Sequence, residues 1–495
     1  MITQLYTPQQ AASWLHERVR GSLRTDSRQV EAGDGFIAWP GAAADARQYV
    51  SDVLKGGAGA CLVEMAGIDA YGFVDAKVAG YRDLKTAAAP IAAAYYCDPS
   101  KQLKTIAVTG TNGKTSTAWW LAQALGKLDR KCGVVGTLGI GMPGAMVFNG
   151  MTTPDPVLLQ QQLRRFVDEG FTACVIEASS IGIAERRLDA THLQLAIFTN
   201  FTQDHLDYHG SMQAYWEAKE SLFTWPDLPS AVINVDDDKG RALSLMLTTS
   251  GMDVWTVGTH EPARLRAEAI EQSAGALTFV VAEGAERRTV RAAAMGLYNV
   301  SNLLGVIGAL RALRLSLDDA VQACCHLSAV PGRLNALSQD GKPLVVIDYA
   351  HTPDAIEKVL LALKPVAQAR GGQLWCVFGC GGDRDASKRP LMAATAQKHA
   401  DQIVVTSDNP RSESPATIIS QILLGLTHSE SVRVQADRAL AIAETLISAQ
   451  PDDVVLLAGK GHEKYQEVAG MTYPFDDLTH AQLALDARKP DGAAS

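Results

Sequence analysis

Short apolar runs recur along the chain and alternate with longer segments of mixed polarity. Between about residue 100 and residue 236 the runs are "TIAVTG", "CGVVGT", "TACVIEAS", "LAIFTN" and "SAVINVD". Continuous apolar runs of this length are typical of strands buried on both faces, and the segments between them have helical patterns. This part of the chain is therefore predicted to form a mostly parallel sheet with crossover helices.

The alternation stops at "SAVPGRLN", residues 328–335, where Pro and Gly interrupt the chain, and it then begins again. The four later runs end in the loops "DYAHTPD", "GCGGDRDASKR", "SDNPRSESP" and "GKGHEKYQ". Ligands of parallel α/β sheets bind at the carboxyl ends of the strands, so these loops are expected to form one binding edge. The first hundred residues have shorter runs, such as "GFIAW" and "GACLVE", and predict a small α/β module.

Composition narrows the function classes. The net charge of −9 argues against nucleic acid or an anionic membrane as the main partner, because the chain has no basic excess. We see no signal sequence and no apolar run long enough to span a bilayer, and we expect a soluble cytoplasmic protein. The eight cysteines form no C-x-x-C pair, so reduced thiols are favoured over a zinc site.

One loop predicts nucleotide binding. "VTGTNGKTST", residues 108–117, joins an apolar run to a helical pattern, as in loops that cradle phosphate with backbone N–H groups and a lysine. It is a shortened form of the general pattern, and an ordinary strand–turn–helix connection is the disfavoured alternative. We predict that Lys114 contacts the β- and γ-phosphates and that Thr115 ligates Mg²⁺. The predicted ATP-binding loop comprises Gly110, Thr111, Asn112, Gly113, Lys114, Thr115 and Ser116.

Charged residues end or follow two later apolar runs, "TACVIE" and "LAIFTN". Glu177 ends the run "TACVIE", where a carboxylate is costly unless it is paired or binds metal, so a Mg²⁺ role is favoured over a solvated strand end. "DHLDYH" beyond the next strand places His205 and His209 among acidic residues and is a candidate site. By its spacing alone, Lys219 would be an ordinary solvated lysine.

Three further features leave alternatives open. Asn299 and Asn302 share a helix face and could be a cap or buried amides, or could contact the base or ribose of a nucleotide. Arg333 follows the Pro-Gly break, from which it could reach a nucleotide, although an isolated arginine is usually a surface residue. "SDNPRSE" could clamp a zwitterion such as an amino acid or could form a turn with a helix cap.

Taken together, "TGTNGKTST", "IEASS", "DHLDYHG", "GLYNVSNLLG", "PGRLN", "DYAHTPD", "GCGGDRD", "DNPR" and "GKGHE" resemble, in order and spacing, the motifs of the Mur ligase family. The resemblance covers nearly the whole chain. It implies an α/β protein with three domains: a UDP-substrate-binding domain at residues 1–99, a central ATP-binding domain at 100–332, and a C-terminal Rossmann-like domain at 333–495 that binds an amino acid.

The resemblance also implies a reaction. ATP would activate the D-Glu γ-carboxylate of UDP-MurNAc-L-Ala-D-Glu as an acyl phosphate, and the amine of meso-diaminopimelate would displace the phosphate, in peptidoglycan precursor synthesis. A lysine-adding ligase and a folylpolyglutamate synthetase-like ligase are the enzymatic alternatives, and a binding module without turnover is a third. "TDSR" and "DNPR" favour the cell-wall enzyme over the folate enzyme. We expect a monomer that binds these substrates, with Mg²⁺ as cofactor.

The resemblance also implies roles for individual residues, assigned from the matching motifs. Lys219 would be carbamylated and, with Lys114 and His205, catalytic. The metal would be held by Thr115, Glu177, His205 and carbamylated Lys219, and the nucleotide also by Asn299, Arg333 and His351. The UDP-MurNAc-dipeptide residues would be Ser27, Thr152, Thr153, Ser179, Glu185 and Arg187. The diaminopimelate residues would be Arg384, Asp408, Asn409, Arg411, Gly459 and Glu463.

Two positions depart from the family pattern. Ile181 stands where the family often has histidine, so a contact made by that histidine is absent here. Glu185 stands where related enzymes often have glutamine, which puts its substrate contact in doubt.

Overall fold

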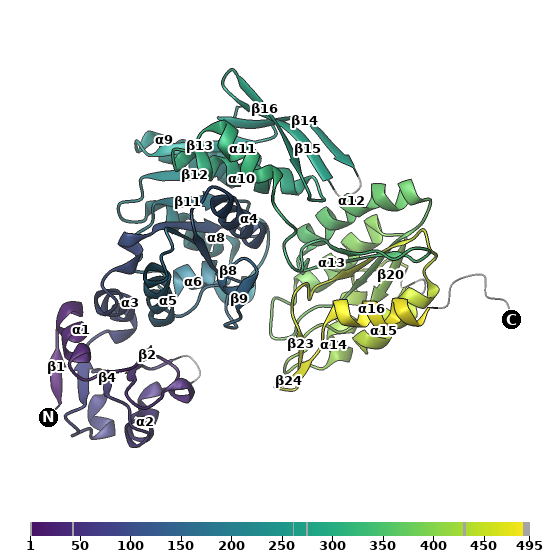
Figure 1. The fold of residues 1–495 in the computed structure, drawn as a ribbon. Helices are drawn as coiled ribbons and strands as arrows, with labels where there is room; N and C mark the ends of the chain where they lie inside the picture. Colours follow the sequence, from purple (N-terminus) through teal and green to yellow (C-terminus); the bar gives the residue numbers. More distant parts are fainter. Residues whose placement is uncertain (1, 42–43, 261, 274–275, 429–431, 489–495) are drawn as a thin grey trace.

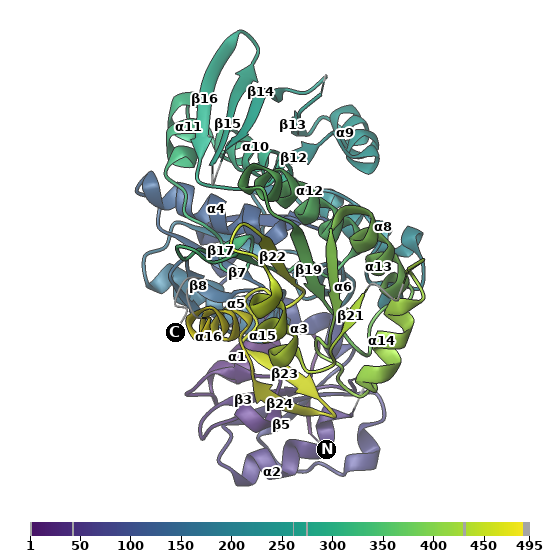
Figure 2. The ribbon, with the colours of Figure 1, turned by 90° about the vertical axis from the view of Figure 1, so that its right-hand side faces the viewer.

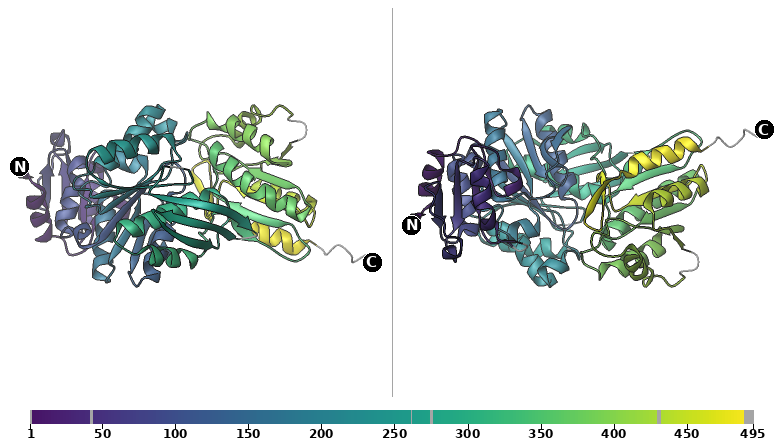
Figure 3. Two further views of the ribbon diagram at one scale, coloured as in Figure 1. Left: turned by 90° about the horizontal axis from the view of Figure 1, so that it is seen from above. Right: turned by 90° about the horizontal axis from the view of Figure 1, so that it is seen from below.

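Three sheets and a small hairpin organise the protein. The computed structural model describes residues 2–41, 44–260, 262–273, 276–428 and 432–488. Figure 1 shows the N-terminal sheet beneath the middle one and the C-terminal sheet beside it, and Figure 3 shows the middle sheet between the other two. The predicted α/β class is confirmed. Within the described ranges, no helix has the length and apolar character needed to cross a membrane.

The N-terminal sheet has five parallel strands in the order β1-β5-β4-β3-β2. Side chains alternate between its faces: Ile37 packs with helices α1 and α3, whereas Phe36 and Ala38 pack with α2. The elements are β1 (Thr3–Leu5), α1 (Pro8–His16), β2 (Leu23–Arg24), η1 (Ser27–Gln29), β3 (Gly35–Ala38), η2 (Ala46–Tyr49), α2 (Val50–Lys55), β4 (Ala60–Glu64), η3 (Ile68–Tyr71), β5 (Val78–Tyr81), α3 (Leu84–Tyr95) and η4 (Pro99–Gln102).

The middle sheet has eleven strands, with β6 near its centre and the order β16-β15-β14-β13-β12-β11-β6-β10-β7-β8-β9. Its strands are parallel from β14 to β7, and antiparallel strands extend both ends. The strands are β6 (Lys104–Thr109), β7 (Cys132–Gly136), β8 (Gly139–Met142), β9 (Ala145–Val147), β10 (Ala173–Glu177), β11 (Leu195–Phe198), β12 (Ser230–Asn234), β13 (Asp253–Gly258), β14 (Leu265–Ser273), β15 (Ala276–Glu283) and β16 (Glu286–Ala292).

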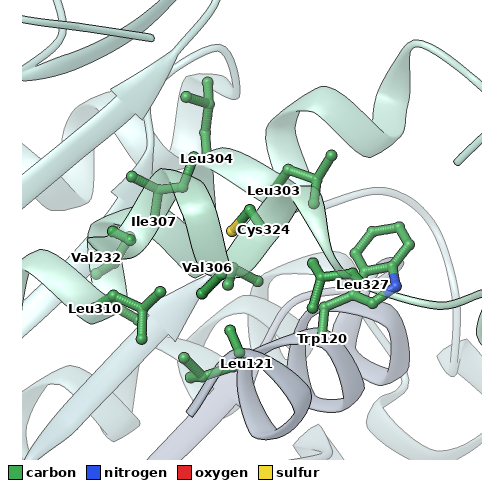
Figure 4. Packing of buried hydrophobic residues seen from close by; sticks show 14 of the residues in the cluster. Trp120, Leu121, Val232, Leu303, Leu304, Val306, Ile307, Leu310, Cys324 and Leu327 are labelled. Atoms are coloured by element: carbon green, nitrogen blue, oxygen red, sulfur yellow. The ribbon is translucent and has the colours of Figure 1, made fainter. Parts of the chain in front are cut away.

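Helices cover both faces of this sheet. One face packs against α4, α10 and α11, and Figure 4 shows Trp120 and Leu121 of α4 beside Leu303 and Val306 of α10. The other face packs against helices that include α5 and α8. The helices are α4 (Lys114–Lys127), α5 (Pro156–Asp168), α6 (Ser180–Ala184), α7 (Leu206–His209), α8 (Met212–Glu220), η5 (Ser221–Thr224), α9 (Asp238–Thr249), α10 (Tyr298–Ala312) and α11 (Leu317–Cys325).

The C-terminal sheet has the order β17-β18-β22-β19-β20-β21, and only its β17–β18 pair is antiparallel. Figure 2 labels β17, β22, β19 and β21 across this sheet. The four polar loops therefore leave neighbouring parallel strands at one edge, as the sequence predicts. The elements are β17 (Asn335–Leu337), β18 (Leu344–Asp348), α12 (Pro353–Arg370), β19 (Leu374–Phe378), α13 (Lys388–His399), β20 (Gln402–Val405), α14 (Pro415–Leu423), β21 (Arg433–Val434), α15 (Arg438–Ser448), β22 (Val454–Ala458), β23 (Tyr465–Val468), β24 (Met471–Pro474) and α16 (Asp477–Ala487).

Candidate active site

The predicted phosphate loop follows the central strand β6 and ends where α4 begins. Gly110 and Gly113 have φ angles of 141° and 85°, which L side chains rarely adopt. A Cβ at Gly113 would also lie 2.4 Å from Oδ1 of Asn302. Nζ of Lys114 donates to the carbonyl oxygens of Gly110 at 2.9 Å and Thr111 at 2.8 Å, so its ammonium lies against the loop.

A buried carboxylate meets the start of α4. Oγ1 of Thr115 donates to Oε2 of Glu177 at 2.9 Å, and the amide of Thr137 donates to Oε1 at 2.9 Å. Nη2 of Arg333, from the far side of the Pro-Gly break, donates to Oγ1 of Thr115 at 3.0 Å. Adjacent hydroxyl and carboxylate oxygens suit Mg²⁺, which usually binds through one or two carboxylates plus phosphates and water.

The remaining ligands of such an ion must come from other groups. In the described part of the chain, no group of three or more His, Cys, Asp or Glu side chains is arranged to hold a metal. Mg²⁺ at Thr115 and Glu177 therefore depends on phosphate oxygens, water or a modified side chain. This requirement fits the predicted metal set, which includes a carbamate at Lys219.

Lys219 is not a solvated lysine. Its side chain in α8 is buried, its Nζ donates to the Gly110 carbonyl at 2.7 Å, and it lies 4.6 Å from the ring centre of Tyr215. Burial and the charge of Lys114 hold the pKa of Lys219 well below its usual value, against the opposing charge of Asp204. The interpretation from spacing alone is thus wrong about the environment of this lysine.

Asp204 joins the middle and C-terminal sheets. Its carboxylate accepts from Nζ of Lys388 at 3.3 Å and lies 3.5 Å from Nε2 of His205 and 3.8 Å from Nε2 of His351. Burial opposes ionisation of Asp204, but its hydrogen bond with His351 and the charge of Lys388 bring its pKa well below the usual value. Burial lowers the pKa of His205 to about 3, which leaves a neutral imidazole at neutral pH.

Three asparagine side chains are hydrogen-bonded near the predicted nucleotide site. Nδ2 of Asn302 donates to Oδ1 of Asn299 at 2.8 Å, and Nδ2 of Asn299 donates to the Met295 carbonyl at 2.7 Å. In the phosphate loop, Nδ2 of Asn112 donates to Oδ2 of Asp354 at 2.7 Å, across the domain junction. Both amides of α10 are therefore buried and hydrogen-bonded, and both also line the cavity described next.

A cavity of about 440 Å³ contains most of these groups. It is lined by the phosphate loop, by Arg333 and His351 from the C-terminal part of the chain, and by Thr152 and Ser179. The sequence-predicted residues that line it are Thr111, Asn112, Gly113, Lys114, Thr115, Ser116, Thr152, Glu177, Ser179, His205, Lys219, Asn299, Arg333 and His351. Residues predicted separately for ATP, metal and muramyl dipeptide are thus brought together.

The other residues predicted for the muramyl dipeptide do not line the cavity, but Thr153 and Arg187 are hydrogen-bonded next to it. Oγ1 of Thr153 donates to the Glu177 carbonyl at 2.6 Å and contacts Oγ of Ser179 at 2.9 Å. Nη1 of Arg187 donates to the Thr153 carbonyl at 2.9 Å. Ser27 begins η1 in the N-terminal domain and does not line the cavity.

Glu185 is already paired. Its Oε2 lies 2.7 Å from Nζ of Lys85 in α3, and its Oε1 accepts from the Tyr208 hydroxyl at 2.5 Å. These hydrogen bonds lower the pKa of Glu185. The carboxylate therefore joins the N-terminal and middle domains, which explains how glutamate is accommodated at this position.

The predicted diaminopimelate residues form a second cluster at the loop edge of the C-terminal sheet. We call it the acceptor cluster, and its members are Arg384, Asp408, Asn409, Arg411, Gly459 and Glu463. Nδ2 of Asn409 donates to Oε2 of Glu463 at 2.8 Å. Arg411 donates from Nη1 to the Gly382 carbonyl at 2.7 Å, and its Nε lies 3.3 Å from Oε2 of Glu467. A Cβ at Gly381 would lie 2.9 Å from Nη1 of Arg411 and 3.7 Å from Cγ of Arg384, so both arginines approach this glycine.

Tyr349 links this cluster to the cavity. Its hydroxyl donates to Oε1 of Glu463 at 3.3 Å, and the guanidinium of Arg333 lies 4.5 Å from its ring centre. Arg333 in turn contacts Thr115, as described above. The acceptor cluster and the phosphate loop are therefore connected through two side chains.

Several residues of this site could not be predicted from the sequence. Tyr349, Asp354 and Lys388 belong to the polar segments quoted above, but tyrosine, aspartate and lysine are common in solvated loops, so the residue type alone does not indicate a site. Thr137 follows a strand and resembles any turn residue. Lys460 lies inside "GKGHE", and only its burial in the structure distinguishes it.

Comparison with known proteins agrees with this arrangement. Two family models match the chain: Mur ligase middle domain at residues 108–310, and Mur ligase, glutamate ligase domain at residues 332–461. A UDP-N-acetylmuramoyl-L-alanyl-D-glutamate–2,6-diaminopimelate ligase from Acidovorax sp. (strain JS42) is 55% identical over 491 residues, which cover 98% of each chain.

Solved structures agree as well. A structure of a ligase with the same name is 33% identical, covers 94% of each chain and has a TM-score of 0.62. The MurF ligase from Thermotoga maritima in complex with ADP is 18% identical, covers 88% of this chain and 93% of its own, and has a TM-score of 0.67, which shows the shared fold. The chain therefore belongs to the Mur ligase family.

Proposed function

We propose that this chain is an ATP-dependent ligase that joins meso-diaminopimelate to the D-Glu γ-carboxylate of UDP-MurNAc-L-Ala-D-Glu. The observation that carries the proposal is the shared cavity, which the phosphate loop, Thr152 and Ser179 all line. A carboxylate held at Thr152 and Ser179 would thus lie close to the γ-phosphate of ATP. Proximity of this kind is a large part of catalysis in phosphoryl transfer.

The first step makes a leaving group. A carboxylate resists attack by an amine, because oxide leaves very poorly. A γ-carboxylate oxygen of D-Glu attacks the γ-phosphorus, the bond between that phosphorus and the bridging oxygen breaks, and ADP departs. Lys114 faces the loop and would stabilise charge on the transferred group, and Mg²⁺ at Thr115, Glu177 and His205 would neutralise phosphate oxygens when bound.

The second step forms the amide. The uncharged amine of diaminopimelate attacks the acyl carbon, the bond from carbon to the phosphate oxygen breaks, and the amine loses a proton as phosphate leaves. Asn299, Arg333 and His351 would hold the nucleotide from the domain junction. The contacts of Asp204 with His351 and Lys388 hold the C-terminal domain near the cavity, which would help to exclude water from the acyl phosphate.

Lys219 is proposed to act as a carbamate. Its amine and that of Lys114 donate to the same carbonyl, so two ammonium groups would repel each other there. A lowered pKa favours the neutral amine, which attacks CO₂ and loses a proton to give an anionic carbamate. The carbamate would attract Lys114 and supply the metal oxygens that the described His, Cys, Asp and Glu side chains do not.

Acceptor choice would depend on charge. Diaminopimelate differs from lysine by a distal carboxylate, and Arg411 is proposed to bind it. With lysine, the guanidinium would lack this partner and would face no compensating anion from the substrate. A site built for a polar group rejects an analogue that lacks it, because its own polar groups are left unpaired.

The domain boundaries and location belong to the same proposal. We assign residues 1–99, 100–332 and 333–495 to three domains, since each range contains one of the three large sheets. The N-terminal range, with Ser27, would hold the uridine end of the substrate. We also propose a monomer in the cytoplasm, where ATP is available.

Phosphate release tests the proposal. The protein is incubated with ATP and Mg²⁺, and phosphate is measured with UDP-MurNAc-L-Ala-D-Glu alone, with meso-diaminopimelate alone, and with both. Phosphate release that requires both substrates supports the ligase. Release that requires folate and glutamate instead would favour the folate alternative, and ATP binding without release would favour a binding module.

A further inference from the structure

Lys460 is a buried cation in the acceptor cluster. It follows β22, its side chain is fully buried, and its Nζ lies 3.1 Å from Oδ1 of Asn409, 3.2 Å from Oε2 of Glu463 and 3.6 Å from Oδ1 of Asp408. A buried ammonium is costly unless it is paired, so these contacts fix its place. None of the roles proposed above uses this lysine.

The lysine also fixes the orientation of an amide. Oδ1 of Asn409 accepts from Nζ of Lys460 and from the backbone amide of Glu467 at 3.0 Å, which directs Nδ2 toward Glu463. Gly459 brings the chain close enough for this arrangement, since its φ is +112° and a Cβ there would lie 2.7 Å from Oδ2 of Asp408. Lys460 therefore orders three of the predicted acceptor residues at once.

Charges around the cluster can be counted. Two carboxylates, Asp408 and Glu463, share the single ammonium of Lys460, which leaves one negative charge. The nearby Arg438 is paired with Asp477 at 2.6 Å, so a carboxylate outside the cluster already balances its charge. Arg411 lies close to Glu467, as described above, and can turn its guanidinium to a substrate carboxylate.

We propose that Lys460 is a specificity-determining residue, because it reduces the charge of the acceptor cluster to one net negative charge. One substrate ammonium neutralises that charge, and no excess then remains to repel a neighbouring substrate carboxylate. The distal end of diaminopimelate is a zwitterion, whereas the distal end of lysine is a cation. Without Lys460, the cluster would carry two negative charges, which favour the cation and disfavour the zwitterion. This inference rests on the proposed function, because it assigns the acceptor site to these residues.

Lys460→Met tests the inference, because methionine has a similar length and no charge. Lys464→Met is the matched control, since Lys464 lies four residues further on and is exposed. For Lys460→Met, we expect kcat/KM for meso-diaminopimelate to fall about 100-fold, a loss typical of removing one partner from a buried charge pair. KM for ATP should stay unchanged, and the preference for diaminopimelate over L-lysine should fall by a similar factor.

Two further variants separate the effect of charge from an effect on folding. Lys460→Met combined with Glu463→Gln removes one charge of each sign and should recover part of the preference for diaminopimelate that Lys460→Met loses. Lys460→Arg keeps the charge and should retain more of the preference than Lys460→Met. If Lys460→Met does not fold, as judged by its melting curve, these two variants still test the charge count against wild type.

The outcomes distinguish the inference from the proposed function. If wild type shows no turnover with diaminopimelate, the proposed function fails. If wild type turns over and the variants keep its preference for diaminopimelate over lysine, the inference about Lys460 alone is overturned. A loss of preference for diaminopimelate that the double variant partly reverses supports it.

Discussion

Replacing Lys219 with methionine should abolish most of the activity and leave the fold intact. Nζ of Lys219 and Nζ of Lys114 lie 2.7 Å and 2.9 Å from the same carbonyl oxygen, so they are at most 5.6 Å apart, the sum of the two distances. Two like charges at that separation repel by about 3 kcal/mol at an effective dielectric constant of about 20. Conversion of the amine to a carbamate reverses the sign of this interaction.

The expected loss of activity follows from this interaction energy. If the carbamate attraction acts on the transition state, its removal costs about 3 kcal/mol, or about 100-fold in kcat/KM. The melting temperature of Lys219→Met should stay close to that of wild type, because an apolar side chain of similar length replaces a buried amine. Lys239→Met is the control, because Lys239, like Lys219, lies over an aromatic ring, here that of Trp216, but does not line the cavity.

A chemical assay isolates the carbamate from the lysine. Wild-type protein is assayed in buffer depleted of CO₂ and again after bicarbonate is added. Activity should fall on depletion and return with bicarbonate, and Lys219→Met should respond to neither treatment. Full activity of wild type after prolonged CO₂ depletion, or full activity of Lys219→Met, would refute this reasoning.

Three further predictions concern other parts of the site. Arg411→Ala should lower kcat/KM for meso-diaminopimelate about 100-fold while KM for ATP is unchanged, because the distal carboxylate loses its charge partner. Steady-state kinetics check this, and equal loss of both would contradict the assignment. Gly113→Ala should raise KM for ATP and destabilise the fold by about 1–3 kcal/mol, because φ is 85° and the new Cβ would contact Asn302. A denaturation curve equal to that of wild type would contradict this prediction. The pKa of His205 is lowered to about 3, so as pH falls below 6.5 the unfolded chain takes up a proton before the folded protein does. The free energy of unfolding should therefore decrease between pH 6.5 and about 3. Melting curves should show a shallower decrease for His205→Asn.

Sequence patterns predicted the sheets well because burial on both faces leaves a continuous apolar signature. β6 and β10 are examples, since every residue of β10 is buried and the run around it is apolar. The phosphate loop was also predictable, because Gly110 and Gly113 need conformations that few other residues adopt. These features depend on local chemistry.

Long-range environment was harder to predict. In the sequence, Lys219 and Lys460 look like any other lysines. Only the surrounding structure makes Lys219 an amine with a lowered pKa and Lys460 a buried ion-pair partner. Glu185 is similar: its pairing with Lys85 joins residues from different domains. Spacing along the sequence does not contain such contacts, so the residues that join domains had to come from the structure.

The most direct test of the central claim is a competition between acceptors. The protein is given ATP, Mg²⁺ and UDP-MurNAc-L-Ala-D-Glu with equal concentrations of meso-diaminopimelate and L-lysine, and the products are identified by mass. We predict a tripeptide product that contains diaminopimelate and essentially none that contains lysine. A product that contains mainly lysine, or no ligation product at all, would contradict the account.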